Sequence, residues 1–369
     1  MKVPYLDLPR QFADKELQAT VLRHLTDCQF VLGAEVERFE VNFAALCRTR
    51  HALGVNSGTD AIFLALKAAG IGPGDEVITV PNSFVATAGA IVAAGARPVF
   101  VDVGPDYNID GAKIAAAVTP RTRAIVPVHL TGNPADMPAV LEVAARHKLF
   151  VVEDAAQAVG AVLDGKTVGS FGQAGAFSLH PLKNLNVAGD GGAIATNDSG
   201  LHQKLKLMRN HGLRNRDEIE FFAFNSRLDS ILAAVANHVM KDLAQITQRR
   251  RENAAWYDQL LSDLDGDVIL PPRQANARQV FHTYVVMAQR RDELMPYLAE
   301  RGVETKVHYR VPIHLQKPCR EMGYKEGDFP VAEKQARMIV TLPIHQYLER
   351  RQIEYTCELI HAFYRGPRA

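Results

Sequence analysis

The sequence predicts an α/β protein whose main domain is built on a largely parallel sheet, and three observations support this. Between residues 51 and 195, short apolar runs rich in β-branched residues alternate with alanine-rich segments of helical period. The runs are apolar on both faces, which is typical of strands that helices cover on both sides. The chain has 369 residues, of which 47% are hydrophobic, so it can form a large core and about two domains.

The predicted elements of this region follow one another as strand and helix. Strands are expected at 76–81, 98–103, 124–130 and 150–155. Helices are expected at 60–70, 85–95 and 137–147, each ending near a glycine or a basic residue as helix C-termini prefer. Ligands of parallel sheets bind beyond the carboxyl ends of the strands, so residues that follow a strand end are the candidate site residues.

The second half of the chain predicts a different organisation. An amphipathic helical stretch from 227 to 264 is expected to bridge two domains. Beyond it, strands expected at 281–288 and 305–309 and helices near 292, 332 and 349 indicate a small α+β domain. We therefore expect a large domain over 1–248, with an N-terminal helical segment, and a small C-terminal domain over 249–369.

Composition excludes several classes of function. Lys and Arg total 42 and Asp and Glu total 41, so no global field would gather nucleic acid or an anionic membrane. No stretch approaches the roughly 18 apolar residues of a membrane span, and the first residues lack the apolar run of a signal peptide. The four cysteines lie too far apart for a zinc site or a disulfide framework. We expect a cytoplasmic protein with reduced thiols and no metal.

The first motif with chemical content is GVNSGTDA at 54–61, where a short strand runs into an apolar helix. Free N–H groups and hydroxyls at the start of a helix suit a phosphate monoester. An ordinary N-cap followed by a glycine turn would explain the same residues. The motif alone does not decide between the two.

Two further motifs place charged groups after strands. In VVEDAAQ at 151–157, Asp154 could cap the next helix or could hold a cationic ring nitrogen. In the glycine-rich turn around Lys183, Ser178 and His180 lie close before the lysine. A lysine is usually a solvated surface charge, but one held in a pocket loses its proton more easily and forms an imine with a carbonyl compound.

The order of these motifs resembles that of the fold-type I enzymes that use pyridoxal 5′-phosphate (PLP). More closely, the segments NSGTDA, VVEDAAQAVGA, SLHPLKNLNVAGDGG and FNSRLDS look like the DegT/DnrJ/EryC1/StrS sugar aminotransferases. The resemblance covers nearly the whole chain. It implies the PLP-dependent transferase fold type I and an aminotransferase of amino-sugar biosynthesis. The implied reaction moves an amino group from glutamate to a nucleotide-linked keto-sugar.

The resemblance also implies roles residue by residue. Lys183 matches the lysine that binds the cofactor as a Schiff base and moves protons, and Asp154 matches the partner of the pyridinium nitrogen. The other implied cofactor-binding residues are Ser57, Gly58, Thr59, Phe84, Gln157, Ser178 and Asn225. The family's counterpart of Asn225 reaches the phosphate from the neighbouring subunit, which implies a homodimer with shared active sites. The candidates for substrate binding are His180, His308, Tyr309 and Arg310.

Some of these assignments have alternatives. His308 and Tyr309 could be a packed pair on a strand. A dense basic run could hold a nucleotide diphosphate or be a solvated helix face; it consists of Lys204, Lys206, Arg209, Arg214 and Arg216. Many relatives differ at three positions, Leu182, Thr131 and Asp190, which leaves the orientation of the substrate open.

Other functions also fit parts of the sequence. A keto-cyclitol aminotransferase or a sugar dehydratase would use the same scaffold, although the dehydratase branch has histidine in place of Lys183. A non-catalytic PLP-binding regulator is a second class, but neither end of the chain carries a basic helical extension for DNA. A Rossmann dehydrogenase would need a Gly-x-Gly-x-x-Gly turn after the first strand, which NSGTDA does not supply. The sequence does not specify the sugar, the ring carbon that is aminated or the stereochemistry.

Overall fold

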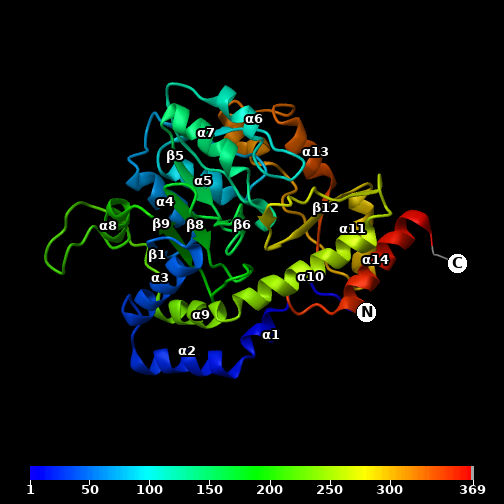
Figure 1. The fold of residues 1–369 in the computed structure, drawn as a ribbon, viewed down its shortest axis with the longest axis horizontal. Coiled ribbons are helices and arrows are strands. Elements are labelled where there is room, and N and C mark those ends of the chain that lie inside the picture. The colour runs from blue at the N-terminus through cyan, green and yellow to red at the C-terminus, as the bar shows by residue number, and fades with distance from the viewer. Residues whose placement is uncertain (367–369) are drawn as a thin grey trace.

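A seven-stranded sheet forms the centre of the computed structural model, which describes residues 1–366 (Figure 1). Neighbouring strands are parallel from β3 across to β8, whereas β9 runs antiparallel to both β8 and β1. The mainly parallel sheet predicted from the sequence is therefore confirmed. In spatial order the strands are β1 (His51–Val55), β9 (Gly192–Thr196), β8 (Ala174–Ser178), β5 (Phe150–Asp154), β4 (Thr122–Ile125), β2 (Glu76–Thr79) and β3 (Arg97–Phe100).

Helices cover both faces of this sheet, as two-sided apolar strands require. Val151 and Val152 of β5 belong to different core clusters because successive side chains of a strand point to opposite faces. On the Val152 side lie α4 (Gly58–Ala68), α5 (Val85–Ala93) and α8 (Ser199–Met208). The opposite face is covered by α3 (Ala34–Cys47), α7 (Met137–His147) and α9 (Ser230–Met240).

The strands and helices predicted between residues 58 and 155 are confirmed, with small shifts at their ends. The strands end earlier than expected, and residues that follow β2, β4 and β5 line a cavity, among them Ser83, Val128 and Ala156. Helix α4 begins at Gly58, two residues before the expected start, because Ser57 is its N-cap.

The predicted long helix from 227 to 264 is wrong in one respect. It is two helices, α9 and α10 (Leu243–Leu261), separated at Lys241 and Asp242. Helix α10 runs from the large sheet to a three-stranded antiparallel sheet of β10 (Val268–Ile269), β12 (Tyr284–Ala288) and β13 (Ile339–Leu342), as Figure 1 shows. The helices α11 (Arg291–Glu300), α13 (Pro330–Met338) and α14 (Arg350–Arg365) belong to this part of the chain.

Two strands predicted in this part differ from the structure. The strand expected at 281–288 begins only at Tyr284, because Phe281 has a φ of 47° that breaks the extended backbone. The strand expected at 305–309 does not form. A single bridge joins Lys306 to Thr341, and the chain then leaves the sheet so that Tyr309 reaches the cavity.

The N-terminal residues connect the two parts of the molecule. The expected N-terminal helical segment is present, and the backbone of Val3 pairs with Val303 of the small part. A division at 248/249 would fall inside the continuous helix α10, so the two-domain boundary stays a prediction. The remaining elements are α1 (Leu8–Phe12), α2 (Lys15–Asp27), α6 (Gly111–Ile114), η1 (Ala115–Ala117), η2 (Leu130–Gly132), β6 (Val162–Leu163), β7 (Lys166–Thr167), β11 (Ala277–Arg278), η3 (Ile313–Leu315) and α12 (Lys317–Glu321).

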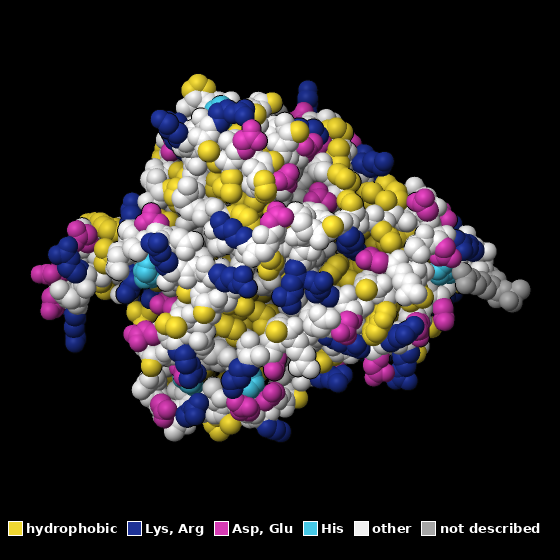
Figure 2. Space-filling model, in the orientation of Figure 1, with side chains coloured by type: hydrophobic (Ala, Val, Ile, Leu, Met, Phe, Trp, Pro, Cys, Tyr) yellow, Lys and Arg dark blue, Asp and Glu magenta, His cyan; other side chains and the backbone are white. Residues whose placement is uncertain are grey.

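The surface carries both signs of charge. On the face shown in Figure 2, positive and negative side chains are intermixed. Within residues 1–366, none of the helices has the length and apolar character needed to cross a membrane. The cysteines are free thiols, three of them buried and Cys28 exposed.

Candidate active site

A partly open cavity of about 310 Å³ lies at the carboxyl ends of β5 and β8 and at the N-termini of α4 and α5. This is the edge of the sheet at which the sequence predicts a ligand. The cavity brings together all of the predicted site residues except Asn225 and Arg310. They are Ser57, Gly58, Thr59, Phe84, Asp154, Gln157, Ser178, His180, Lys183, His308 and Tyr309.

Lys183 lies in the turn between β8 and β9 and lines the cavity, so it is not a solvated surface lysine. The turn is closed by a hydrogen bond of 2.8 Å from the Lys183 N–H to the carbonyl of His180. Burial lowers the pKa of Lys183 to about 8, and the negative charge of Asp154 opposes this shift. At neutral pH a usable fraction of this amine is therefore an uncharged nucleophile.

Asp154 is the last residue of β5, and its carboxylate faces the same cavity. Its Oδ2 accepts a hydrogen bond of 2.7 Å from Thr87 Oγ1, and its Oδ1 accepts one of 3.2 Å from the Ala156 N–H. Burial raises the pKa of Asp154, while these hydrogen bonds and the charge of Lys183 lower it. No helix begins at the turns that follow β5 in the described chain, so the alternative role as a helix cap is wrong.

Glu153, the neighbouring residue, points to the other face of β5. Its side chain is fully buried and accepts hydrogen bonds from His129 Nε2, at 3.1 Å, and from the N–H groups of Gly169, Phe171 and Gly172. The Ala135 N–H donates to His129 Nδ1, so the hydrogen of this imidazole is on Nε2. These bonds fasten the 169–172 turn and the segment after β4, and they leave Glu153 no part in the cavity.

The N-terminus of α4 closes one end of the cavity. Ser57 Oγ accepts a hydrogen bond of 3.0 Å from the Asp60 N–H, so Ser57 is the N-cap of α4. Because Ser57 also lines the cavity, the cap and the predicted phosphate site coincide. The first N–H groups of a helix have no partner within it. A Cβ on Gly58 would lie 2.7 Å from Ser178 Cβ, so a glycine is needed where α4 meets β8. Helix N–H groups beside the hydroxyls of Thr59 and Ser178 suit a phosphate.

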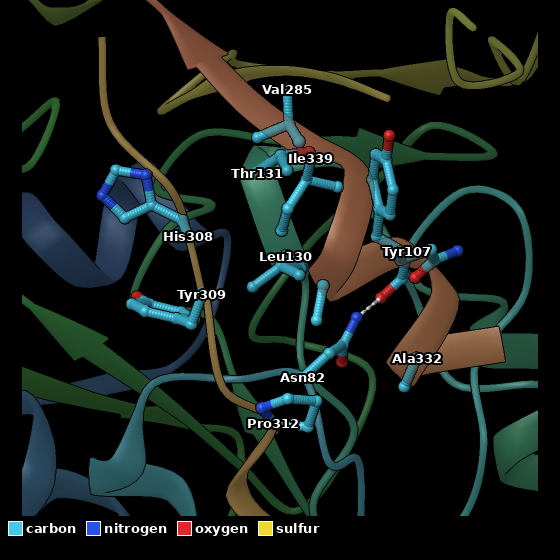
Figure 3. A pocket seen from close by; sticks show the side chains of 12 residues that line it. Asn82, Tyr107, Leu130, Thr131, Val285, His308, Tyr309, Pro312, Ala332 and Ile339 are labelled. Atoms are coloured by element: carbon cyan, nitrogen blue, oxygen red, sulfur yellow. Dashed lines mark hydrogen bonds between the residues drawn. The ribbon is translucent and has the colours of Figure 1, made fainter. Parts of the chain in front are cut away.

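Gln157 links the cavity to the small part of the molecule. Its Oε1 accepts a hydrogen bond of 2.7 Å from the Thr131 N–H, and its Nε2 lies 3.4 Å from the hydroxyl of Tyr309. The ring of Tyr309 is 5.7 Å from that of Phe84 between centroids. Figure 3 shows that Tyr309 also borders a second, mainly apolar cavity, which Thr131 lines.

The histidines of the site are held in different ways. His308 Nδ1 lies 2.9 Å from Thr341 Oγ1, and burial lowers the pKa of His308 to about 4. Its ring stacks on Tyr5 and lies edge-on to Tyr309, 5.4 Å away between centroids. The two residues do not lie on a strand and both line the cavity, so the alternative of a packed pair on a strand is wrong. His180 lines the cavity beside Lys183, and burial lowers its pKa as well. The imidazoles of His180 and His308, which line the cavity together with Lys183, are therefore neutral at pH 7.

Two predicted site residues lie elsewhere. Asn225 is exposed and pairs with Asn210 at the base of a segment that projects from the body of the molecule at the left of Figure 1. Arg310 forms an ion pair of 2.9 Å with Asp292 on the surface. Within this chain neither residue contacts the cavity, and their assigned roles stay predictions.

The basic run does not line the cavity either. Arg209 is buried and holds the fold together by binding Glu40 and the carbonyl of Gly54. Lys204 Nζ donates to the carbonyl of Ala68 over 2.7 Å, and Arg214 pairs with Glu220. Within one chain, three residues of this run therefore make structural contacts, and none of the five lines the cavity.

Sequence reasoning missed three polar residues that line the cavity, Ser83, Thr87 and His282. Ser83 and Thr87 could have been found, because they follow strand β2 at the start of a helix and lie four residues apart. Two of the positions at which relatives differ, Leu182 and Asp190, also line the cavity. The third, Thr131, acts through its backbone bond to Gln157.

The residues fit PLP by the chemistry of their donors. One end of the cavity offers helix N–H groups and hydroxyls for a phosphate, Asp154 offers a carboxylate for a ring nitrogen, and Lys183 offers an amine of lowered pKa for an aldehyde. The glycine contact between α4 and β8 keeps the phosphate end free of a β-carbon.

Comparisons with known proteins agree with this site. The model of the DegT/DnrJ/EryC1/StrS aminotransferase family matches residues 11–361. A "pleiotropic regulatory protein" of Geobacillus stearothermophilus is 45% identical, covering 99% of each chain. The "dTDP-3-amino-3,4,6-trideoxy-alpha-D-glucose transaminase" of Streptomyces venezuelae is 44% identical over 95% of this chain and 93% of the relative.

A solved structure confirms the predicted fold type. The crystal structure of Streptomyces venezuelae DesV in complex with a ketimine intermediate superposes with a TM-score of 0.95 at 43% identity, covering 100% of this chain and 99% of the other. The likeness therefore extends over the whole chain and is not confined to the seven-stranded sheet. This chain belongs to the DegT/DnrJ/EryC1/StrS aminotransferase family and is a PLP-dependent aminotransferase.

Proposed function

We propose that this aminotransferase moves the amino group of glutamate to a keto group on a nucleotide-linked sugar, in amino-sugar biosynthesis. The observation that carries the proposal is that Lys183, Asp154 and the N-terminus of α4 face one cavity. The Streptomyces venezuelae relative supports the substrate class, because its name gives a dTDP-linked amino sugar. The four free thiols fit a reducing compartment, and we place the enzyme in the cytoplasm.

Each residue of the cavity has a proposed task. When bound, PLP supplies a carbonyl carbon that takes up nitrogen and a ring that accepts electrons. The amine of Lys183 holds the cofactor and, once released, moves a proton from the α-carbon of the donor. Asp154 holds a proton on the ring nitrogen. Ser57, Thr59 and Ser178 bind the phosphate with the N–H groups of α4, and Phe84 and Gln157 contact the ring.

The remaining candidates are placed on the substrate side. His180, His308 and Tyr309 lie beside Lys183 or over Phe84, where the sugar would enter. Arg310 can reach an anionic substrate only if its ion pair with Asp292 opens. Of the four candidates for substrate binding, Arg310 is therefore the one that must first break an ion pair.

We further propose a homodimer in which Asn225 of one protomer reaches the phosphate in its partner. Asn225 is exposed, and three apolar side chains of the same projecting segment are also exposed: Phe222 at 94%, Ile219 at 50% and Phe224 at 37%. Apolar side chains at this exposure are costly in water and fit burial against a second copy. The segment would then complete two equivalent sites.

The reaction is tested with a panel of keto-sugar nucleotides and keto-cyclitols, with glutamate as donor and mass spectrometry as the readout. The proposal predicts a mass change of amine for ketone on a sugar nucleotide, and 2-oxoglutarate in equal amount. Turnover of the keto-cyclitols alone would favour the alternative function of a keto-cyclitol aminotransferase. The Lys183→Ala variant is the matched control and should show no product while its circular dichroism is unchanged.

A second candidate is suggested by the Geobacillus relative, whose name describes a regulatory protein. A non-catalytic PLP-binding regulator would load the cofactor on Lys183 yet turn over no keto compound of the panel. Reduction of the loaded protein with borohydride separates this case from a wrong lysine. Both functions predict that the cofactor is fixed to the peptide containing Lys183, and labelling of another lysine would reject that assignment.

The shared site is tested by complementation. Lys183→Ala and an Asn225→Ala variant should each be nearly inactive, and mixing them should form heterodimers with one intact site. Activity per heterodimer should reach at most about half that of the wild type, by the two-fold symmetry. No recovery after verified exchange of subunits would reject the shared site.

A further inference from the structure

Two buried hydroxyl groups are linked to Asp154 by hydrogen bonds in the cofactor cavity. Thr87 Oγ1 donates to Asp154 Oδ2 over 2.7 Å, and Ser83 Oγ lies 2.7 Å from Thr87 Oγ1. Thr87 is fully buried and Ser83 is 4% exposed. All three side chains line the same cavity. The two hydroxyls thus form a short chain that ends on the carboxylate proposed to meet the ring nitrogen.

The chemistry of the groups fixes the direction of this chain. An ionised carboxylate only accepts hydrogen bonds, so the single proton of Thr87 points to Asp154. The proton between the two hydroxyls then belongs to Ser83. If Asp154 is protonated, both bonds can reverse without movement of any heavy atom, because a hydroxyl donates and accepts equally well. The same geometry therefore accommodates both protonation states of the carboxyl group.

Helix α5 explains why the two hydroxyls lie together. Phe84 is its N-cap, so Ser83 directly precedes the cap and Thr87 lies in the first turn, where its N–H donates to the carbonyl of Phe84 over 3.1 Å. The first turn of a helix carries the positive end of the helix dipole. Asp154 therefore meets a donor and a favourable field at the same place.

We propose that Thr87 and Ser83 are positioning residues that orient the carboxylate of Asp154 and keep it ionised for the ring nitrogen of the cofactor. This inference rests on the role proposed above for Asp154. The Ala156 N–H and Thr87 each occupy one carboxylate oxygen, which leaves acceptor sites on the side of the cavity. Burial raises the pKa of Asp154 and the Thr87 hydrogen bond lowers it, so loss of Thr87 favours the neutral form.

The decisive variant is Thr87→Val, which keeps the shape of the side chain and removes the donor. The Kd for PLP, measured by fluorescence titration of the apoprotein, should rise about tenfold to a hundredfold, as for a lost hydrogen bond to a charged group. Thr87→Ser should restore most of the affinity. In the ligand-free protein, the Asp154 carboxyl followed by ¹³C NMR should titrate at higher pH in Thr87→Val than in wild type.

A matched control comes from the same strand-helix unit. Thr79 is also a fully buried threonine, and its Oγ1 donates to the carbonyl of Val126 over 2.9 Å without contact to Asp154. Thr79→Val should lower the melting temperature but leave the Kd for PLP and the titration of Asp154 unchanged. If Thr79→Val weakens PLP as much as Thr87→Val does, the effect is a general loss of stability and the inference is overturned.

A double-mutant cycle shows whether Thr87 acts through Asp154. In an Asp154→Asn background, Thr87→Val should change the Kd by less than about twofold, because the charge it supports is gone. If Asp154→Asn itself changes neither the Kd nor the donor half-reaction, the proposed role of Asp154 fails. If Asp154→Asn has its effect but Thr87→Val equals wild type, or is fully additive, only the present inference fails.

A variant that fails to fold does not end the test. Ser83→Ala removes the outer hydroxyl alone and should raise the Kd for PLP by about threefold, since it acts on the carboxylate at one remove. Folding is checked by the thermal melt of each apoprotein. A Ser83→Ala protein with wild-type Kd and wild-type Asp154 titration would overturn the part of the inference that includes Ser83.

Discussion

Glu153 and Asp154 are consecutive carboxylates at the end of β5, yet the two sides of the strand hold them differently. On one side, Glu153 accepts four hydrogen bonds, three of them from backbone N–H groups of the 169–172 turn. On the other side, Asp154 accepts two, and the rest of its acceptor capacity faces a cavity that Lys183 also lines. Both side chains are buried.

The difference shows how a structural carboxylate can be told from a functional one at the same depth. A carboxylate has about four lone-pair sites, and four donors occupy those of Glu153, so this group has no capacity left for a ligand. Burial removes the Asp154 carboxylate from water, and its two hydrogen-bond donors do not fully compensate for the lost solvation. The pKa of Asp154 is therefore raised. A cationic ring nitrogen would supply the missing partner. Incomplete satisfaction, rather than burial, marks the cofactor side of the strand.

The largest expected effect on this comparison comes from Asp154→Asn. The substitution should leave the fold intact but slow the donor half-reaction by about two to four orders of magnitude, because a neutral amide no longer holds a proton on the ring nitrogen. Single-turnover absorbance with glutamate measures it. A wild-type rate would make both carboxylates of β5 structural and would remove the contrast.

The corresponding substitution at the neighbouring position, Glu153→Gln, should lower the stability of the fold rather than the rate of the reaction. An amide offers one acceptor oxygen where four donors now meet a carboxylate, so at least one buried N–H of the 169–172 turn loses its partner. We expect a loss of about 3 kcal/mol in the free energy of unfolding. Urea unfolding of the apoprotein is the measurement. The donor half-reaction of the protein that remains folded should change far less than in Asp154→Asn, and an equal loss would contradict the division of roles.

The same comparison shows what the sequence could and could not predict. The position of Asp154 after a strand makes it a site candidate, because parallel strands bring their carboxyl ends to one edge. The roles of Lys183 and Ser178 in the same site come from the resemblance to the aminotransferase family. The sequence could not separate the roles of Glu153 and Asp154 by hydrogen bonding, because the donors to Glu153 come from a turn that no pattern predicts. The position of Thr87 after β2 could have marked it as a site residue, but its bond to Asp154 joins two strand-helix units and no sequence pattern predicts that bond.

Residues that depend on a second chain were the other difficulty. Asn225 is exposed and pairs with Asn210 away from the cavity, so its predicted role depends on a second chain. The strand expected at 305–309 failed because Tyr309 is directed into the cavity instead of pairing along β13. Hydrophobic periodicity predicts helices and strands whose apolar faces pack against the core. It fails where contacts in a site or at an interface determine the course of the backbone.

The smallest expected effect concerns Lys183, which shares the cavity with Asp154 and has no counterpart on the Glu153 side. Because burial lowers the pKa of Lys183 to about 8, about a tenth of the amine is uncharged at pH 7 and about nine tenths at pH 9. Only the uncharged amine attacks an aldehyde, so the rate at which apoprotein binds PLP covalently should rise roughly tenfold over that interval and then level off. Stopped-flow absorbance from pH 6.5 to 10 measures the rate, with free PLP and a lysine peptide as the reference. A rate that keeps rising tenfold per pH unit above pH 9 would indicate an ordinary lysine. It would also mean that the cavity side of β5 does not perturb its charged groups as the contrast with Glu153 requires.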